Sequence, residues 1–136
     1  MTAAGQILSG DPLSHEDCLA RLGEADLARV VLSVRALPAA LPTRITLVGE
    51  DHLLLASAED AVILAARRGD VISVQIDGLE LDGTTWSVMA SGIAATATDG
   101  DTGEGLSEAV AHGATLLSLP LSVVTGRRSR WAPSSR

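Results

Sequence analysis

Short runs with the character of β-strands recur along this 136-residue chain, and they limit its possible folds more than any other feature. Such runs are rich in β-branched residues or alternate apolar with polar residues, as a strand with one buried face does. They cover residues 28–35, 40–48, 52–56, 71–77, 84–97 and 116–124. About six strands in so short a chain favour a small closed barrel over an open sheet.

Three residues interrupt these runs and predict local irregularities. Pro38 follows the first run and is expected to end it. Gly92 lies inside the long fifth run and predicts a bulge or a bend. Pro120 lies inside the last run, which indicates an edge strand or a bulge there.

Three segments have the period of a helix instead. The first begins at Ser14, which forms a capping-box pattern with Asp17, and it ends at Gly23. The second, 57–68, begins with a capping serine and has acidic residues in its first turn and arginines in its last. A third short helix is expected around 106–112. The chain is therefore predicted to be mainly β with short helices.

The ends of the chain differ in composition from its body. Residues 1–12 lack the basic start and apolar centre of a signal peptide and are expected to be a flexible segment. The domain is expected to span 13–128, with order lost after Gly126 and a flexible basic tail at 129–136. Four of the ten basic residues follow Gly126, whereas all 17 acidic residues precede it.

The composition excludes several functions. The chain has no lysine, which excludes a Schiff base to pyridoxal phosphate. Its net charge of −7 and its lack of Phe and Tyr weigh against binding to nucleic acid. No apolar run approaches the length of a membrane-spanning helix. The single cysteine, Cys18, fits a reducing cytoplasm and reads as core filling. The three histidines are scattered, so no metal site is expected.

Three segments together resemble the pyridoxamine 5′-phosphate oxidase-like family. They are the opening helix 13–22, the strand 86–94 that begins Trp-Ser-Val, and the closing segment 120–128 that ends Val-Thr-Gly-Arg-Arg. The resemblance covers about residues 13–128 and implies a six-stranded antiparallel split barrel that forms a homodimer. In this family FMN usually lies in a groove between the subunits, while some relatives use a deazaflavin and a few bind heme.

The resemblance also implies which residues hold the cofactor. It assigns to cofactor binding Arg44, Ile45 and Thr46 on the second strand, Ser57 at the start of the helix, Trp86, and Arg127 and Arg128 from the partner subunit. Arginines and hydroxyls are groups that an FMN phosphate requires. Each of three residues also has a simpler interpretation: Arg44 as an exposed strand residue, Ser57 as a helix cap, and Trp86 as a packing residue.

One departure from the family pattern affects the phosphate site. A Ser/Thr-Lys pair often stands where this chain has Ala61 and Val62, and here Glu59 and Asp60 come just before. Each carboxylate would repel a phosphate by on the order of 1 kcal/mol when partly screened. Three hypotheses follow. The chain is a flavin-dependent oxidoreductase, or it is a cofactor-poor relative that binds a small ligand, acts as an accessory protein or catalyses a non-redox reaction. A narrower alternative is a protein that binds a deazaflavin or heme.

Overall fold

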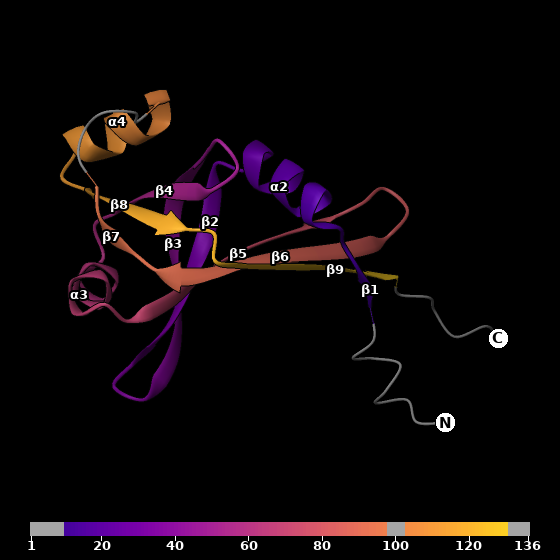
Figure 1. Cartoon of the computed structure of the whole chain (residues 1–136), viewed down its shortest axis with the longest axis horizontal. Coiled ribbons are helices and arrows are strands. Elements are labelled where there is room, and N and C mark those ends of the chain that lie inside the picture. Colours follow the sequence, from indigo (N-terminus) through magenta and orange to yellow (C-terminus); the bar gives the residue numbers. More distant parts are fainter. Residues whose placement is uncertain (1–9, 98–102, 131–136) are drawn as a thin grey trace.

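The computed structural model describes residues 10–97 and 103–130 (Figure 1). The elements in this part of the chain are β1 (Asp11–Pro12), α2 (His15–Glu24), β2 (Leu27–Val34), β3 (Leu37–Val48), β4 (His52–Ser57), α3 (Asp60–Arg68), β5 (Val71–Leu79), β6 (Thr84–Ile93), β7 (Ala95–Thr96), α4 (Gly103–Ala111), β8 (Thr115–Pro120) and β9 (Val123–Arg130). The strands form one antiparallel sheet in the order β1-β9-β6-β5-β2-β3-β4-β8-β7. The prediction of a mainly β fold with short helices is confirmed, although with nine strands instead of six.

The sheet curls into a barrel because β6 runs directly into β7, which pairs with β8. At this crossing β6 comes close to the end of β8. A Cβ atom on Gly92 would lie 2.7 Å from the carbonyl oxygen of Pro120, closer than such atoms can approach. Gly92 pairs in regular register with Ile72, so no bulge forms there, and the close approach to β8 accounts for the glycine. β6 ends one residue later, at Ile93.

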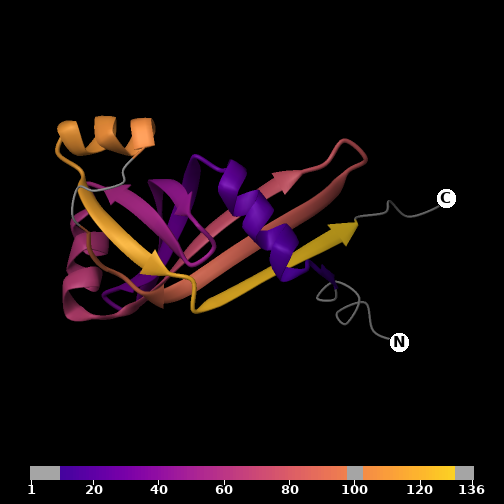
Figure 2. The same ribbon diagram turned by 45° about the horizontal axis from the view of Figure 1, so that its top comes forward.

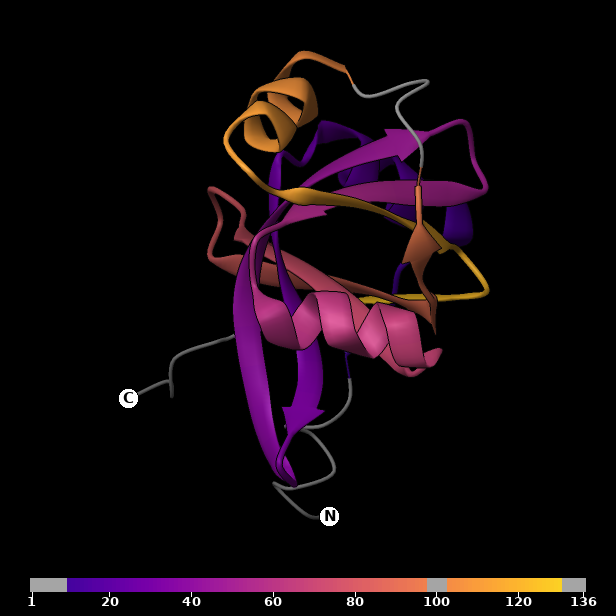
Figure 3. The same cartoon turned by 90° about the vertical axis from the view of Figure 1, so that its left-hand side faces the viewer.

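The barrel interior is aliphatic. Its most buried side chains include Leu53, Leu55, Ile72, Val74 and Val88, each 0–1% exposed. Two helices complete this core: α2 contributes Leu22 and Cys18, and α3 contributes Val62. Figure 3 views the barrel from the α3 side, with α2 behind the strands, and Figure 2 shows α2 lying obliquely across them. None of the described helices is long and apolar enough to cross a membrane.

The third helix, α4, packs on the outside of the barrel over β4 and β8 (Figure 1). Leu106 on α4 joins Leu54, Ala56 and Leu116 in a second, smaller apolar cluster. This cover explains why β4 is apolar on both faces: one face meets the barrel interior and the other meets α4.

The predicted break at Pro38 is wrong, because β2 and β3 form one long hairpin whose tip projects from the barrel (Figures 1 and 3). The chain reverses at Arg35 and Ala36, which both have left-handed backbone conformations, with φ of 52° and 65°. Pro38 is tolerated in β3 because β4 pairs with β3 only from Arg44 onward. The lost N–H therefore breaks no ladder on that edge. We call residues 32–41 the arm.

The last predicted strand is in fact two. Thr115–Pro120 forms β8, and Val123–Arg130 forms β9, which pairs with β6 over its whole length. The expected loss of order after Gly126 is therefore wrong for residues 127–130. Pairing with β6 provides hydrogen-bond partners for the backbone N–H and C=O groups of these residues. The second helix also begins later than predicted, at Asp60, because Ser57 still belongs to β4.

The expected terminal segments 1–12 and 129–136 lie mostly outside the described residues. Where they are described they are strand: Asp11–Pro12 forms β1 against β9, and β9 continues to Arg130.

Candidate functional site

The outer face of β5, β6 and β9 carries polar side chains in cross-strand rows. Ser73 and Ser91 are hydrogen-bonded at 2.6 Å between their hydroxyl oxygens. Further along the same face, Gln75, which pairs with Met89, donates its side-chain amide diagonally to Ser87 at 3.3 Å. These side chains are half-buried although no element in the described part of the chain covers them, so this face is a candidate for ligand or partner contact.

The outer face changes character from one end to the other. At one end Val71 pairs with Ile93, and Val123 lies beside them, with exposures of 65%, 54% and 56%. At the opposite end Arg29 and Asp77 form an ion pair at 3.4 Å. One half of the face is thus an unpartnered apolar surface, and the other half is charged.

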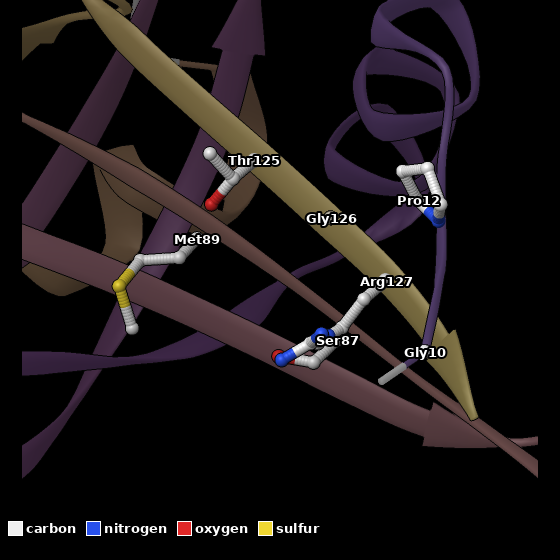
Figure 4. A pocket seen from close by; sticks show the side chains of 7 residues that line it. All are labelled: Gly10, Pro12, Ser87, Met89, Thr125, Gly126 and Arg127. Carbon is white, nitrogen blue, oxygen red and sulfur yellow. The ribbon is translucent and has the colours of Figure 1, made fainter. Parts of the chain in front are cut away.

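A groove of about 350 Å³ lies on this face between β6, β9 and the segment before α2 (Figure 4). It is lined by Gly10, Pro12, Ser87, Met89, Thr125, Gly126 and Arg127. We call it the outer-face groove. It offers two hydroxyls, one guanidinium and one thioether, a set that can bind an anionic group beside an apolar or aromatic one.

The two arginines predicted to act together lie on opposite faces of β9. Arg127 stands opposite Ser87 and lines the outer-face groove, whereas Arg128 stands opposite Trp86 on the other face. This follows from the alternation of side chains along a strand. Only Arg127 of this pair can therefore contact a ligand in the outer-face groove of its own chain.

Trp86 is half-buried. Its indole packs against Arg21 of helix α2 and against Gly78 of the neighbouring strand β5. The Arg21 guanidinium carbon of α2 lies 4.3 Å from the centroid of the indole, and Arg21 also pairs with Glu80 at 3.1 Å. On β5 the indole lies against Gly78, where a Cβ atom would be 2.5 Å from the ring. These contacts give Trp86 a packing role, while its contact with a cofactor stays a prediction.

The predicted residues of β3 lie beside α4, away from the outer-face groove. Arg44 is exposed and donates its Nε–H to the carbonyl of Asp26 at 3.3 Å. Ile45 belongs to the barrel core, so only its backbone can serve a ligand, and its N–H already donates to Asp26. Thr46 is half-buried opposite Leu54. A Cβ atom on Gly105 would meet the Arg44 guanidinium, so α4 passes close to this exposed side chain.

Arg44 and Ser57 do not converge on one point. Arg44 stands opposite Ala56, so the next residue, Ser57, faces the other side of the ladder. Ser57 is 3% exposed, and its hydroxyl accepts the N–H of Glu59 at 3.1 Å. The hydroxyl thus stabilises the turn before α3, where Glu59 is the N-cap residue.

The start of α3 lacks a cation, as the sequence indicated. Val62 is fully buried in the core, so a lysine at this position would direct its ammonium group into the barrel interior. Ala61 is half-buried, and Glu59 and Asp60 are exposed. Among the described residues 57–62, no cationic side chain is therefore available at this helix start for a phosphate.

Sequence reasoning missed Met89, Thr125 and Pro12 as groove residues. They come together only through the pairing of β6 with β9 and of β9 with β1. Thr125 lay within the Val-Thr-Gly-Arg-Arg motif, and that motif was the one available signal.

Cys18 is not part of the site. It is 1% exposed, and its sulfur lies so close to Gly126 that a Cβ atom there would be 2.6 Å away. Burial raises the pKa of the Cys18 thiol, and the neighbouring Asp17 carboxylate raises it further. The thiolate, which is the reactive form, is therefore disfavoured.

The barrel, its helices and its outer-face groove define a split β-barrel protein, and comparison with solved structures supports this. The FAD-binding protein of Mycobacterium smegmatis has 22% sequence identity and a TM-score of 0.67, over 90% of this chain and 100% of that one. An FAD-binding protein from Mesorhizobium loti has 19% identity and a TM-score of 0.72, over 88% and 96%. An FAD- and heme-binding protein from M. smegmatis has 19% identity and a TM-score of 0.66, over 90% and 75%.

The sequence itself identifies the family. The profile of the pyridoxamine 5′-phosphate oxidase family matches residues 14–128, which is most of the chain. No curated protein matches the sequence. The chain belongs to the pyridoxamine 5′-phosphate oxidase family, and the resemblance inferred from its motifs is confirmed.

Proposed function

We propose that this protein is a flavin-dependent oxidoreductase that binds FMN in the outer-face groove, at a site completed by a second copy of the chain. One observation carries the proposal: Ser87, Thr125 and Arg127 converge with Met89 in a groove beside an unpartnered apolar sheet face. Fold relatives described as FAD-binding proteins support a flavin as the ligand.

In this proposal the chain binds and orients the cofactor, and the flavin supplies transfer of a hydride or of single electrons. The Arg127 guanidinium holds the anionic phosphate. The hydroxyls of Ser87 and Thr125 donate to or accept from polar edges of the ligand, and Met89 gives an apolar contact. The proposal includes a reducing cytoplasm as the location, in keeping with a single buried thiol.

The second copy is proposed to cover the apolar half of the outer face. Exposed Val71, Ile93 and Val123 form a contiguous apolar surface next to the groove. Contiguous apolar surface of this kind is typical of protein interfaces. A copy placed there would shield the groove from water and could bring its own polar residues to the ligand.

A second candidate function is a cofactor-poor protein that binds another small ligand in the same groove. It is favoured by the arrangement at α3, where the Ser57 hydroxyl is used within the chain and Glu59 and Asp60 are exposed. Such a protein would bind neither FMN nor a deazaflavin.

The test is a titration of the purified full chain with FMN, FAD, riboflavin and a deazaflavin. Binding is measured as quenching of the cofactor's fluorescence. We expect Arg127→Gln to weaken FMN binding about tenfold, the scale of one charge-assisted hydrogen bond. Riboflavin, which has no phosphate, should be affected less than twofold. Arg128→Gln is the matched control because its side chain lies on the other face of β9.

Several results would contradict the proposal. A colourless protein that binds none of the four cofactors would favour the second candidate. Loss of FMN binding in Arg44→Ala with full binding in Arg127→Gln would move the phosphate to β3. For the second copy, Ile93→Asp should give a monomer in sedimentation with weakened flavin binding. A wild-type protein that is monomeric at working concentrations would refute the shared site.

A further inference from the structure

A second groove lies away from the outer-face groove, between the arm and α3. Its volume is about 380 Å³, which is within the range of roughly 300–1,000 Å³ for small-molecule sites. We call it the arm groove. It is lined by Leu32, Ser33, Val34, Arg35, Ala61, Leu64, Ala65, Arg68 and Asp70.

The floor of the arm groove is apolar. Leu32 and Val34 come from the arm, and Leu64 comes from α3. Leu64 is 46% exposed, a large open apolar surface for a helix residue that lines a groove. Leu32 is partly buried against the core, so the groove continues the barrel's own apolar packing to the surface.

The rim of the groove is cationic. Neither the Arg35 nor the Arg68 guanidinium has an ion pair or hydrogen bond within the described residues. By contrast, Arg21 and Arg29 on the same molecule both pair with carboxylates. Asp70 also lines the groove, which leaves an excess of one positive charge at the rim.

Arg35 reaches this rim through a strained turn. Arg35 and Ala36 hold left-handed conformations that glycine and asparagine adopt at lower cost. Such strain tends to persist where a residue has a use beyond folding. Arg35 at this turn and Arg68 in the last turn of α3 both line the groove.

From the apolar floor and the two unpaired arginines we infer that the arm groove binds a small amphiphilic carboxylate. The alkyl or aryl part would lie on Leu32, Val34 and Leu64, and the carboxylate would lie between Arg35 and Arg68. This inference is independent of the proposed flavin site, since the two grooves share no residue.

Isothermal titration of the full chain with octanoate, octan-1-ol and octylamine tests this site. We expect one octanoate per chain, and binding at least tenfold tighter than that of octylamine, whose charge has the opposite sign. From butanoate to octanoate each added methylene should tighten binding two- to fourfold, the upper value corresponding to full burial.

Two pairs of variants distinguish octanoate binding in the arm groove from nonspecific binding elsewhere on the surface. Arg68→Gln should weaken octanoate binding about two- to fivefold, and the adjacent Arg67→Gln should not, because Arg67 does not line the groove. Leu64→Asp should abolish binding, whereas Leu81→Asp, at an exposed leucine on the β5–β6 turn, should leave it unchanged. Both leucines are exposed, so all four variants are expected to fold.

Three outcomes would overturn the inference. One is no saturable binding of octanoate, and another is equal binding of octanoate and octylamine. The third is a change of oligomeric state in Leu64→Asp but not in Leu81→Asp. That last result would show that a second copy of the chain occupies the arm groove instead of a small carboxylate.

Discussion

Gly92→Ala tests the closure of the barrel with a single methyl group. Gly92 is buried where β6 passes the end of β8. The new Cβ atom would lie 2.7 Å from the Pro120 carbonyl oxygen, against about 3.3 Å for a close carbon–oxygen contact. Because the obstacle is a backbone atom in a paired strand, the two strands would have to separate by about 0.6 Å.

The expected loss of stability combines two effects. Overpacking of this kind costs about 1–3 kcal/mol. Alanine also restricts the unfolded chain, which offsets about 0.4–1 kcal/mol. The middle of these two ranges gives a net decrease in the free energy of unfolding of about 1.3 kcal/mol, between outer limits of about 0 and 2.6 kcal/mol. For a chain of 136 residues the middle value corresponds to a fall in Tm of about 5 °C.

Urea unfolding followed by circular dichroism measures this change, with Gly23→Ala as the matched control. At Gly23, in α2, the new Cβ would meet only a Leu47 methyl at 3.6 Å, an ordinary contact. The control should therefore raise stability, by up to about 1 kcal/mol, because alanine is the better helix former. If Gly92→Ala were as stable as the wild type, β6 and β8 would not approach as described.

Three further predictions concern other packing contacts. Gly78→Ala, made in a Trp131→Phe background, should shift the fluorescence of Trp86, because the new Cβ would lie 2.5 Å from the indole; an unchanged spectrum would contradict that contact. Ala36→Gly should raise the free energy of unfolding by up to about 1 kcal/mol in urea titration, because it relieves a φ of 65°; a decrease would refute strain at the turn. The Cys18 thiol, whose pKa burial raises, should react with a disulfide reagent near pH 8 only in denaturant, and rapid reaction of the native protein would contradict its burial.

The sequence predicted helix ends and strand faces well where these depend only on residues close together in the chain. Ser14 caps α2 and accepts the N–H of Asp17 at 3.0 Å, as the capping pattern indicated. Gly69 ends α3 in a left-handed conformation. The alternation in 71–77 is that of a strand with one buried face, and in the structure Ile72, Val74 and Ile76 lie on that buried face.

The errors occurred where distant pairing decides the outcome. Pro38 could remain within β3 because, among the described residues, no second strand pairs with β3 there, a fact that depends on where β4 ends. Residues 127–130 were expected to lose order with the basic tail, yet they form a strand because β6 pairs with them. Likewise, the groove residues Met89 and Thr125 lie far apart in sequence, and only the β6–β9 register brings them together.

The placement of the predicted ligands bears on how many chains a flavin site requires. Arg44 and Arg127 both point to the outer face, but β2, β5 and β6 lie between their strands. Four strand spacings separate them by about 19 Å along the sheet. One phosphate cannot contact both arginines of one chain at that distance. If Arg44→Ala and Arg127→Gln both weaken FMN binding and neither weakens riboflavin binding, both arginines act on the phosphate and must come from different copies. An effect of Arg127→Gln alone would place the phosphate within one outer-face groove.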